Sequence, residues 1–242
     1  VQTLNSKVRQ NVQRVDGRDA ILKRLEKLCS YDNAAVVIDL IYGFPEQTMD
    51  VWEDDLRTAA SLPLDGVDCY QLNVFEKSPL AKYISLGKLP AAADTAMKAD
   101  MFAKSVEILT ASQWKRLSNN HWRRTNRERN IYNELGKSAC DCLAFGCGAG
   151  GRLAGYSFMM DRKLADWNTG IDAGHKPVMV LSAPRPLWHM LRTISSEMEL
   201  GAINLKRLAA KFKQPVDTVA NDVIEQWISA GLLTRCGDWL LQ

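Results

Sequence analysis

The chain has 242 residues, of which 46% are hydrophobic and 24% are charged, and 31 Lys and Arg residues nearly balance 28 Asp and Glu residues. This composition excludes a disordered chain, because enough apolar material is present to offset the entropy lost on folding. No apolar run approaches the roughly 20 residues that cross a bilayer, and a formal net charge of +3 does not argue for nucleic-acid binding.

The first half of the chain has the pattern of an α/β fold. Apolar residues at helical spacing and short β-branched runs alternate, and this order predicts parallel strands joined by crossover helices. Thr48 is the expected N-cap of the second helix, and a loop is expected around Pro79. The predicted elements are helix 19–31, strand 34–41, helix 48–62, strand 66–74 and helix 94–112.

The last third, after Pro177, predicts three helices and a hairpin. The helices are expected at 187–200, 204–212 and 217–230, and the hairpin has its turn near Gly237. This order is winged-helix-like, but the third helix contains neither Lys nor Arg, so contact with phosphates is not expected. We therefore predict two domains, residues 1–165 and residues 166–242.

Six cysteines lie at positions 29, 69, 140, 142, 147 and 236. In a chain of this size they do not suggest a secreted disulfide scaffold, and no signal peptide is recognisable, so a reducing cytoplasm is expected. Cys140, Cys142 and Cys147 do not have a zinc-site spacing, and we expect buried structural cysteines. A redox or ligand role for Cys147 is the alternative.

Two further segments contain candidate sites. Asp39 lies inside an apolar strand that should be covered on both faces, so its carboxylate either points into a site or is held by structural hydrogen bonds. The glycine-rich segment 146–151 is either a backbone cradle for an anion or a tight loop. It is not a dinucleotide-binding motif, because no helix is expected after Gly151.

The segment HWRRTNRERN begins at His121 and is rich in arginine. Arg123 and Arg124 can clamp carboxylates, Trp122 can stack on a flat ligand and His121 can bind haem iron. The simpler interpretation is a solvated basic start of a helix.

Taken together, these segments resemble a known family. VQTLNSKVRQNVQR, DLIYGFPEQT, YQLNVFEKSPL and GCGAGG occur in the order seen in the radical S-adenosylmethionine (SAM) enzymes related to oxygen-independent coproporphyrinogen III oxidase. RLSNNHWRRTNRERNIYN with CLAFGCGAGGRLAGYSFM resembles one branch, the anaerobic haem-degrading enzymes called anaerobilin synthases or haem-degrading radical SAM methyltransferases.

The resemblance implies the C-terminal portion of an incomplete (β/α)6 barrel followed by a small helical domain. It implies a [4Fe–4S] cluster and SAM as cofactors, haem or a related porphyrin as substrate, and an electron donor such as a flavodoxin. The expected activity is methylation of haem and opening of the porphyrin ring without oxygen, which releases the iron.

The resemblance also implies roles for single residues. Gln2, Arg14, Asp39, Leu72, Asn73 and Phe75 match positions that bind SAM, and Asn130, Ile131, Tyr132, Gly148 and Gly150 match positions that bind a second SAM. For the porphyrin only the physical argument is available: Arg123 and Arg124 for propionates, Trp122 for the ring face and His121 for iron.

The cluster-binding motif C-x3-C-x2-C is not found in these 242 residues and is expected before Val1. We therefore interpret the chain as the C-terminal part of a longer enzyme, and expect it to be inactive alone because a cluster needs its thiolates. The alternatives are a haem chaperone, an oxygen-independent coproporphyrinogen III oxidase and, from the winged-helix outline alone, a DNA-binding regulator.

Overall fold

A computed structural model describes residues 1–137 and 140–242, with the side chains of 137 and 216–219 left out. The chain divides into two compact units, Val1–Arg129 and Asn130–Gln242. The boundary expected after residue 165 falls instead inside helix α7 (Leu164–Asp172). That helix connects two hydrogen-bonded strands of one sheet, so a domain boundary there would divide the sheet.

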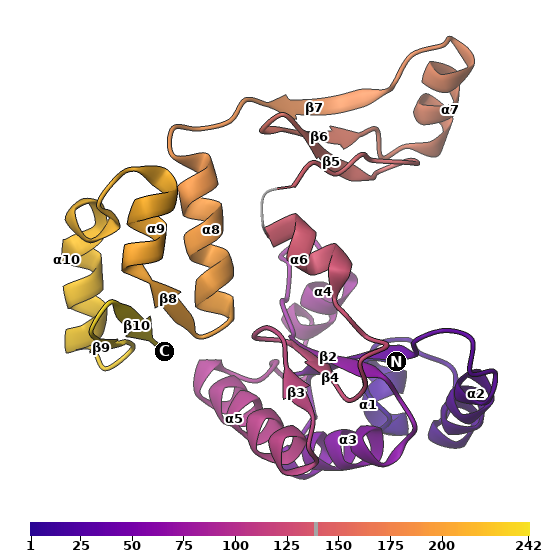
Figure 1. The fold of residues 1–242 in the computed structure, drawn as a ribbon. Helices are drawn as coiled ribbons and strands as arrows, with labels where there is room; N and C mark the ends of the chain where they lie inside the picture. Colours follow the sequence, from indigo (N-terminus) through magenta and orange to yellow (C-terminus); the bar gives the residue numbers. More distant parts are fainter. Residues whose placement is uncertain (138–139) are drawn as a thin grey trace. The chain divides into compact units, whose positions relative to one another are not determined.

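Unit 1 is built on a four-stranded sheet with the order β1-β2-β4-β3 (Figure 1). β1 (Val37–Tyr42) and β2 (Gly66–Gln71) are parallel, as expected. β4 (His121–Arg123) pairs antiparallel with both β2 and β3 (Lys115–Arg116). Gln2 adds a parallel bridge to Leu40 of β1, so the start of the chain extends the sheet.

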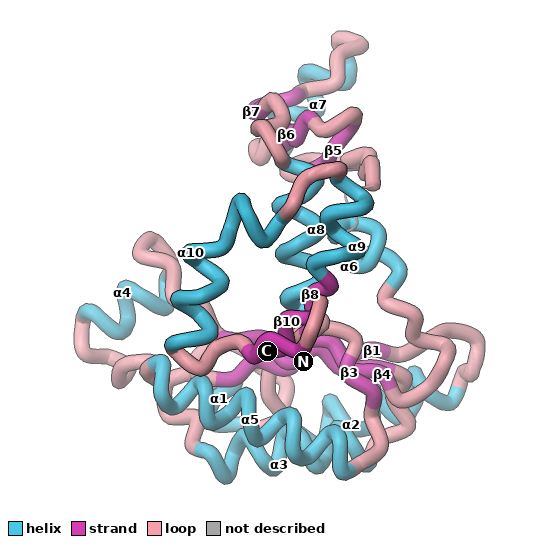
Figure 2. The backbone as a smooth tube through the Cα atoms, turned by 60° about the vertical axis from the view of Figure 1, so that its left-hand side comes forward, coloured by secondary structure: helices cyan, strands magenta, loops and turns pink. Residues whose placement is uncertain are grey.

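Three helices cover one face of this sheet, as Figures 1 and 2 show: α2 (Arg18–Ser30), α3 (Met49–Ser61) and α5 (Thr95–Ala111). Their apolar faces pack on alternate strand residues in one core, which includes Leu40, Val67 and Trp52 at 0% exposure. Thr48 caps α3 as predicted, since its side chain accepts a hydrogen bond from the Val51 N–H.

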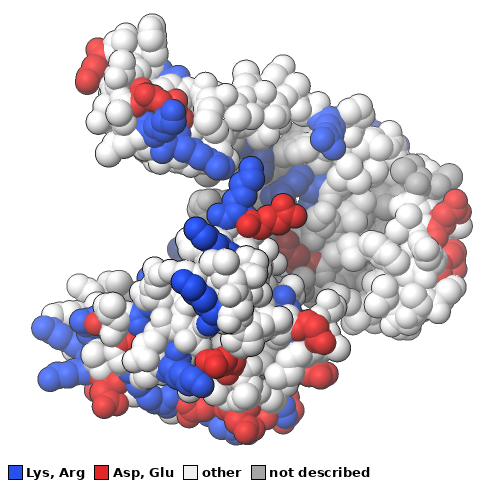
Figure 3. Space-filling model, turned by 180° about the vertical axis from the view of Figure 1, so that it is seen from behind, with Lys and Arg blue, Asp and Glu red and all other residues white. Residues whose placement is uncertain are grey.

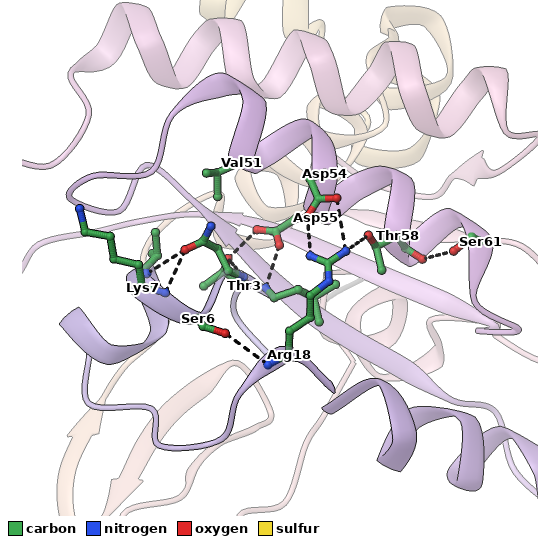
Figure 4. Close-up of polar contacts among 12 residues, drawn as sticks. Thr3, Ser6, Lys7, Arg18, Val51, Asp54, Asp55, Thr58 and Ser61 are labelled. Atoms are coloured by element: carbon green, nitrogen blue, oxygen red, sulfur yellow. Dashed lines mark hydrogen bonds and ion pairs between the residues drawn. The ribbon is translucent and has the colours of Figure 1, made fainter. Parts of the chain in front are cut away.

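The N-terminal segment is attached to α3 by a buried carboxylate (Figure 4). Asp55 is fully buried and accepts the Thr3 hydroxyl at 2.6 Å and the Leu4 N–H at 2.7 Å. Burial raises the pKa of Asp55 to about 6, although these two hydrogen bonds oppose the shift. The carboxylate thus fixes the segment that precedes α1 (Ser6–Asn11).

A buried guanidinium also holds this segment. Arg9 is 5% exposed, and its Nη1 donates to the carbonyls of Val1 and Thr3, at 2.5 and 2.9 Å. Its Nε donates to the Asp16 carbonyl at 2.7 Å. A single side chain therefore satisfies three backbone carbonyls at the edge of the sheet.

The loop expected around Pro79 is a helix, so that prediction is wrong. α4 (Pro79–Ser85) begins at this proline, and the Ser78 side chain accepts a hydrogen bond from the Ala81 N–H. Proline is well tolerated at the first helical position, because its missing N–H would have no intrahelical partner there.

Unit 2 begins with α6 (Ile131–Lys137) and contains an antiparallel sheet with the order β5-β6-β7. The strands are β5 (Gly150–Leu153), β6 (Tyr156–Met160) and β7 (Val178–Ser182), and α7 connects the last two. Gly151 starts no helix, as expected, because it lies in β5.

The remainder of unit 2 follows the predicted order of helices and hairpin. α8 (Trp188–Glu199), α9 (Leu205–Phe212) and α10 (Val216–Ser229) surround an apolar cluster that includes Leu208 and Leu240. The hairpin strands β9 (Thr234–Cys236) and β10 (Trp239–Leu241) pair as expected, and β8 (Ala202–Asn204) joins them on the other side of β10.

Charges of both signs are interspersed on the face drawn in Figure 3. Within the described residues, no helix combines the length and the apolar character needed to cross a membrane.

Candidate functional site

The sheet of unit 1 carries polar side chains on the face that the helices leave uncovered. Ile38 and Leu40 of β1 are buried in the core, whereas Asp39 between them is exposed. Asp39 pairs in register with Asp68 of β2, which in turn pairs with His121 of β4. The expectation that this strand is covered on both faces is therefore wrong, and the Asp39 carboxylate is solvated rather than buried.

His121 is the centre of a buried ionisable cluster on this polar face. The residue is 3% exposed, and its Nδ1 lies 2.9 Å from Asp68 Oδ1 and its Nε2 3.4 Å from Glu128 Oε1. Burial alone would lower the pKa of His121, but the hydrogen bond and charge of Asp68, together with Glu128, outweigh it and raise the pKa. The imidazolium is therefore favoured between two carboxylates.

Glycine at position 66 makes room for Glu128 in this cluster. A Cβ atom at Gly66 would lie 3.0 Å from Glu128 Cγ, 3.1 Å from Val37 Cγ2 and 3.2 Å from the Trp122 carbonyl oxygen. Two of these neighbours belong to strands and have little freedom to move. The strand position opposite Arg123 thus needs a residue without a side chain.

Tyr70 extends the polar face along β2. Burial, followed by the charges of Asp68 and Asp39, raises the pKa of Tyr70 to about 12. The phenol therefore stays protonated at neutral pH, hydrogen-bonds with Asp68 and Asn120, and is 38% exposed. It can donate a hydrogen bond without titrating itself.

The structure changes the interpretation of the segment expected to bind haem. Trp122 is 1% exposed and belongs to the apolar core, so its indole has no face to offer to a porphyrin ring. The ring nitrogens of His121 face Asp68 and Glu128 rather than an open site. These two expected roles need correction, because alternate residues of β4 point to the core and to the carboxylates.

The two arginines of the segment differ. Arg124 Nη1 donates to the Leu62 carbonyl at 2.6 Å, so part of this guanidinium is used within unit 1. Arg123 is half-buried and pairs in register with Gly66. The expected basic helix start is a strand followed by a loop, because β4 pairs with β2 along the sheet.

Two of the residues expected to bind SAM, Gln2 and Asp39, meet beside β1 at the edge of the sheet. Gln2 N–H donates to the Asp39 carbonyl at 2.7 Å, and Ile41 N–H donates to the Gln2 carbonyl at 2.6 Å. Gln2 has a φ of 69°, an uncommon value for a residue with a side chain. Arg14 is exposed, and its charge, like that of Asp39, acts on the Val1 ammonium group.

The other three expected SAM residues follow β2. Leu72 is 8% exposed and packs with Val8 and Phe44, and its carbonyl accepts a hydrogen bond from Lys98 Nζ at 3.1 Å. Asn73 is exposed and Phe75 is 72% exposed. Because β1 and β2 are parallel, Tyr42 and Leu72 leave the sheet at the same edge, where the Leu72 N–H donates to the Tyr42 carbonyl.

The residues expected to bind a second SAM all lie in unit 2. Asn130 is 6% exposed with a φ of 52°, while Ile131 and Tyr132 are 47% and 78% exposed at the start of α6. Gly148 has a φ of 72° and donates its N–H to the Asp161 carbonyl, and Gly150 begins β5. Tyr132 and Gly150 line one cavity of about 510 Å3.

The cysteines do not fit an iron–sulfur cluster. Cys69 is buried in the core of unit 1, and burial raises its pKa and that of Cys29. Among the described residues no group of three or more His, Cys, Asp or Glu side chains is arranged to hold a metal ion. Contrary to the expectation of buried structural cysteines, Cys140 is exposed and Cys142 and Cys147 are half-buried.

Sequence reasoning missed the arginines of the cavity in unit 2. Arg152 of β5 and Arg192 of α8 both line it, with side chains that converge on the Gly136 carbonyl. They are 40 positions apart, and although Arg152 lies in the segment CLAFGCGAGGRLAGYSFM, Arg192 lies in none of the segments that carry the resemblance, so no local pattern could have joined them. Glu128 was missed as well, although it lies in the quoted basic segment.

No family model matches the chain. The anaerobilin synthase of Escherichia coli O157:H7 is 37% identical over 237 residues, which cover 96% of this chain and 51% of that protein. The oxygen-independent coproporphyrinogen III oxidase of Thermostichus vulcanus is 24% identical over 187 residues, covering 72% of this chain and 57% of that protein. This chain thus spans little more than half the length of the curated relatives it matches.

A solved structure has a similar fold. The coproporphyrinogen III oxidase of Escherichia coli, described as a radical SAM enzyme, matches with a TM-score of 0.80 and 15% identity over 100% of this chain and 58% of its own. At this identity the likeness concerns the mixed α/β fold alone. Together with the 37% identity to anaerobilin synthase, it confirms the resemblance of this chain to the radical SAM enzymes related to oxygen-independent coproporphyrinogen III oxidase, and to the haem-degrading branch among them.

Proposed function

We propose that this chain is the part of a radical SAM enzyme that binds SAM and haem for anaerobic methylation and opening of the porphyrin ring, with release of iron. The observation that supports this function is the sequence identity of 37% to an anaerobilin synthase over 96% of the chain. The identity to an oxygen-independent coproporphyrinogen III oxidase is 24% over 72% of the chain.

The sheet edge of unit 1 has side chains of the right chemistry for SAM. Arg14 is exposed and presents a guanidinium for a carboxylate, and the exposed Asp39 presents a carboxylate for an ammonium or hydroxyl group. Asn73 and Phe75 follow the C-terminal end of β2 and can pair with and stack on an adenine. When bound, SAM supplies a methyl group and, with a reduced cluster, a carbon radical; this chain's residues hold and orient it.

The second SAM is assigned to Asn130, Ile131, Tyr132, Gly148 and Gly150 in unit 2. Tyr132 is exposed and can stack on a base, and the positive φ angles at Asn130 and Gly148 are typical of backbone that approaches a ligand closely. Arg123 and Arg124 remain candidates for the porphyrin propionates in this proposal.

These 242 residues do not supply the cluster. Their cysteines lack the C-x3-C-x2-C spacing, so no step of the reaction is assigned to them. We propose that the chain alone binds its ligands without turning them over.

The finer fold assignment is also part of the proposal. Parallel β1 and β2 with α3 between them form one β/α/β unit of an incomplete (β/α)6 barrel. The order α8, β8, α9, α10, β9, β10 supports a winged-helix-like C-terminal domain. An electron donor such as a flavodoxin and a cytoplasmic location complete the assignment, and the latter is supported by free thiols at Cys29, Cys69, Cys142, Cys147 and Cys236.

The test joins this chain to the N-terminal part of the Escherichia coli anaerobilin synthase that precedes the aligned region. The chimera, with haem, SAM and a reductant and without oxygen, should lose its Soret band and form a linear tetrapyrrole. The unfused chain should leave haem intact. The matched control is the chimera with its C-x3-C-x2-C cysteines replaced by alanine, which should also be inactive.

Two other results would replace the proposal. Haem that stays bound and unaltered in a cluster-loaded chimera would favour a haem chaperone. Release of carbon dioxide from coproporphyrinogen would favour coproporphyrinogen oxidation, the activity named for the enzyme whose fold matches with a TM-score of 0.80.

A further inference from the structure

The cavity of about 510 Å3 in unit 2 combines charged and aromatic walls. Arg152 contributes from β5, Arg192 from α8, Tyr132 from α6 and Phe158 from β6. Its volume lies within the range of about 300–1,000 Å3 that small-molecule sites occupy. The cavity therefore joins α6, the β5–β6 hairpin and α8.

Two guanidinium groups are fixed at this cavity by a shared acceptor. Arg192 Nη2 donates to the Gly136 carbonyl oxygen at 2.8 Å, and Arg152 Nη1 donates to the same oxygen at 3.2 Å. The Arg152 guanidinium also lies over the Trp188 ring, 5.0 Å from its centroid. Each contact uses only part of the five N–H donors that a guanidinium carries, so most donors remain for another partner.

One of those remaining donors is buried. Arg192 Nε has no hydrogen-bond partner among the described residues, although it is inaccessible to solvent. A buried N–H without an acceptor costs on the order of 1–3 kcal/mol, so a bound acceptor would stabilise this arrangement. A carboxylate has the planar pair of oxygens that can accept from two N–H groups of one guanidinium.

Acidic groups also line the cavity. Asp141 Oδ1 accepts the Ala154 N–H at 2.8 Å, so this carboxylate is engaged with the backbone. Glu199 of α8 also lines the wall. The cavity wall thus carries carboxylates as well as guanidinium groups.

The aromatic wall is held by a close contact with glycine. A Cβ at Gly151 would lie 2.5 Å from Phe158 Cζ and 2.8 Å from the Cys142 carbonyl oxygen. The Phe158 ring is thus seated directly over the backbone of β5 at Gly151, and the Lys176 ammonium lies 5.3 Å from its centroid. Tyr132, which is 78% exposed, is therefore the side chain that offers flat aromatic surface at this cavity.

We propose that Arg152 and Arg192 form a carboxylate-binding subsite for a ligand with a flat aromatic ring system. The ligand chemistry deepens the proposed function, on which the choice of ligands rests: haem and SAM both join a ring system to carboxylates. This subsite replaces Trp122 as the place where a ring can stack, and adds a pair of arginines to those of the 121–124 segment.

The experiment compares ligands that differ only in the carboxylate. Protoporphyrin IX is titrated against its dimethyl ester by absorbance, and S-adenosylhomocysteine against 5′-methylthioadenosine by calorimetry, with the 242-residue chain. Arg192→Gln and Arg152→Gln should each weaken one free-acid ligand by about tenfold or more, the loss expected for a charged hydrogen bond. The ester, or the thioadenosine, should bind both variants as it binds the wild type.

The matched control is Arg235→Gln, which removes an arginine of the same unit that pairs with Glu225 at the surface. Arg192→Lys keeps the charge but loses the planar fork, and should weaken binding nearly as much as Arg192→Gln. The thermal unfolding midpoint of each variant shows whether weaker binding comes from loss of the subsite or from loss of the fold. If Arg192→Gln does not fold, Arg192→Lys takes its place in the comparison.

The outcomes separate the two ligand sources. Weakened protoporphyrin identifies propionates as the bound group, and weakened S-adenosylhomocysteine identifies the amino-acid carboxylate. Equal binding of all four ligands to wild type and folded variants would overturn the subsite, as would equal weakening of acid and ester. Haem degradation by the chimera does not enter these readouts, so the subsite and the proposed function can fail separately.

Discussion

The two faces of the unit 1 sheet are made by the same strands but differ in the polarity and burial of their side chains. On one face Leu40 and Val67 are fully buried and Trp122 nearly so, beneath α2, α3 and α5. On the other face Asp39 and Tyr70 are exposed, while Asp68 and His121 are buried with Glu128. Successive residues of a strand point to opposite faces, so neighbouring residues contribute in turn to the apolar core and to the polar face.

The largest expected effect is on the apolar face. Trp52 is fully buried and its Nε1 donates to the Met101 carbonyl at 2.8 Å. Trp52→Ala should lower the free energy of unfolding by about 3–5 kcal/mol, because it removes a large buried ring and leaves a cavity. Urea unfolding measures the change, and Phe75→Ala at an exposed aromatic should leave the midpoint nearly unaltered. A similar loss in both variants would contradict the assignment of Trp52 to the buried core.

The next effect concerns Asp55, whose pKa rises from its ordinary value of 3.8 to about 6 on folding. The folded state binds more protons than the unfolded state between these values, so stability is highest below pH 4 and falls as the pH rises to 6. At about 1.4 kcal/mol per pH unit the fall is on the order of 3 kcal/mol.

Urea unfolding from pH 4 to pH 7 measures this dependence as the difference between the wild type and Asp55→Asn. The variant cannot titrate at position 55 and should lack this component of the slope. If the wild type instead became more stable relative to Asp55→Asn as the pH rises, the Thr3 and Leu4 hydrogen bonds would outweigh the effect of burial on the pKa of Asp55.

On the polar face, His121→Gln should lower the free energy of unfolding by about 1–3 kcal/mol, because Asp68 and Glu128 lose a charged partner. The pKa of His121 is raised in the folded state, so its contribution is complete below pH 6.5 and is lost as the pH rises through the folded value. NMR titration of the imidazole in the wild type and in Asp68→Asn checks the cause: the variant should have the lower pKa.

The smallest effect lies outside both faces. Arg127 pairs with Asp32 at the surface, with side chains 40% and 83% exposed, and Arg127→Ala should cost about 0.5 kcal/mol, since solvent and salt screen such pairs. Unfolding in low and high salt should show this loss only at low salt. A loss above 2 kcal/mol would show that the hydrogen bond of Arg127 to the Ala34 carbonyl is the stronger contact.

The sequence predicted those parts of the fold in which local pattern and packing agree. For helix α3 the sequence predicts an N-cap at Thr48 and an apolar stripe that includes Trp52 and Leu56, and the structure confirms both. The hairpin with its turn at Gly237 was equally clear. The strand at 121–123 was not, because Trp122 lies between two polar residues, of which His121 is buried against Asp68 rather than solvated.

The candidate site was less predictable for a physical reason. The resemblance assigned Gln2 and Asp39 to one site, and the structure places them side by side, where the Gln2 N–H donates to the Asp39 carbonyl. The resemblance gave no basis for predicting that Arg152 and Arg192 lie together. Both donate to the Gly136 carbonyl, and these contacts form only when α6, β5 and α8 pack together. Contacts between distant segments depend on tertiary packing, which composition and spacing do not specify.

Arg9 has a consequence for ligand binding. By fixing the carbonyls of Val1, Thr3 and Asp16, it immobilises the backbone on both sides of Gln2. The conformational entropy of this edge is therefore lost during folding rather than on association, and a ligand that reaches Gln2 meets a preorganised surface. At the proposed SAM site, a buried side chain that touches no ligand would thus lower the entropic cost of binding.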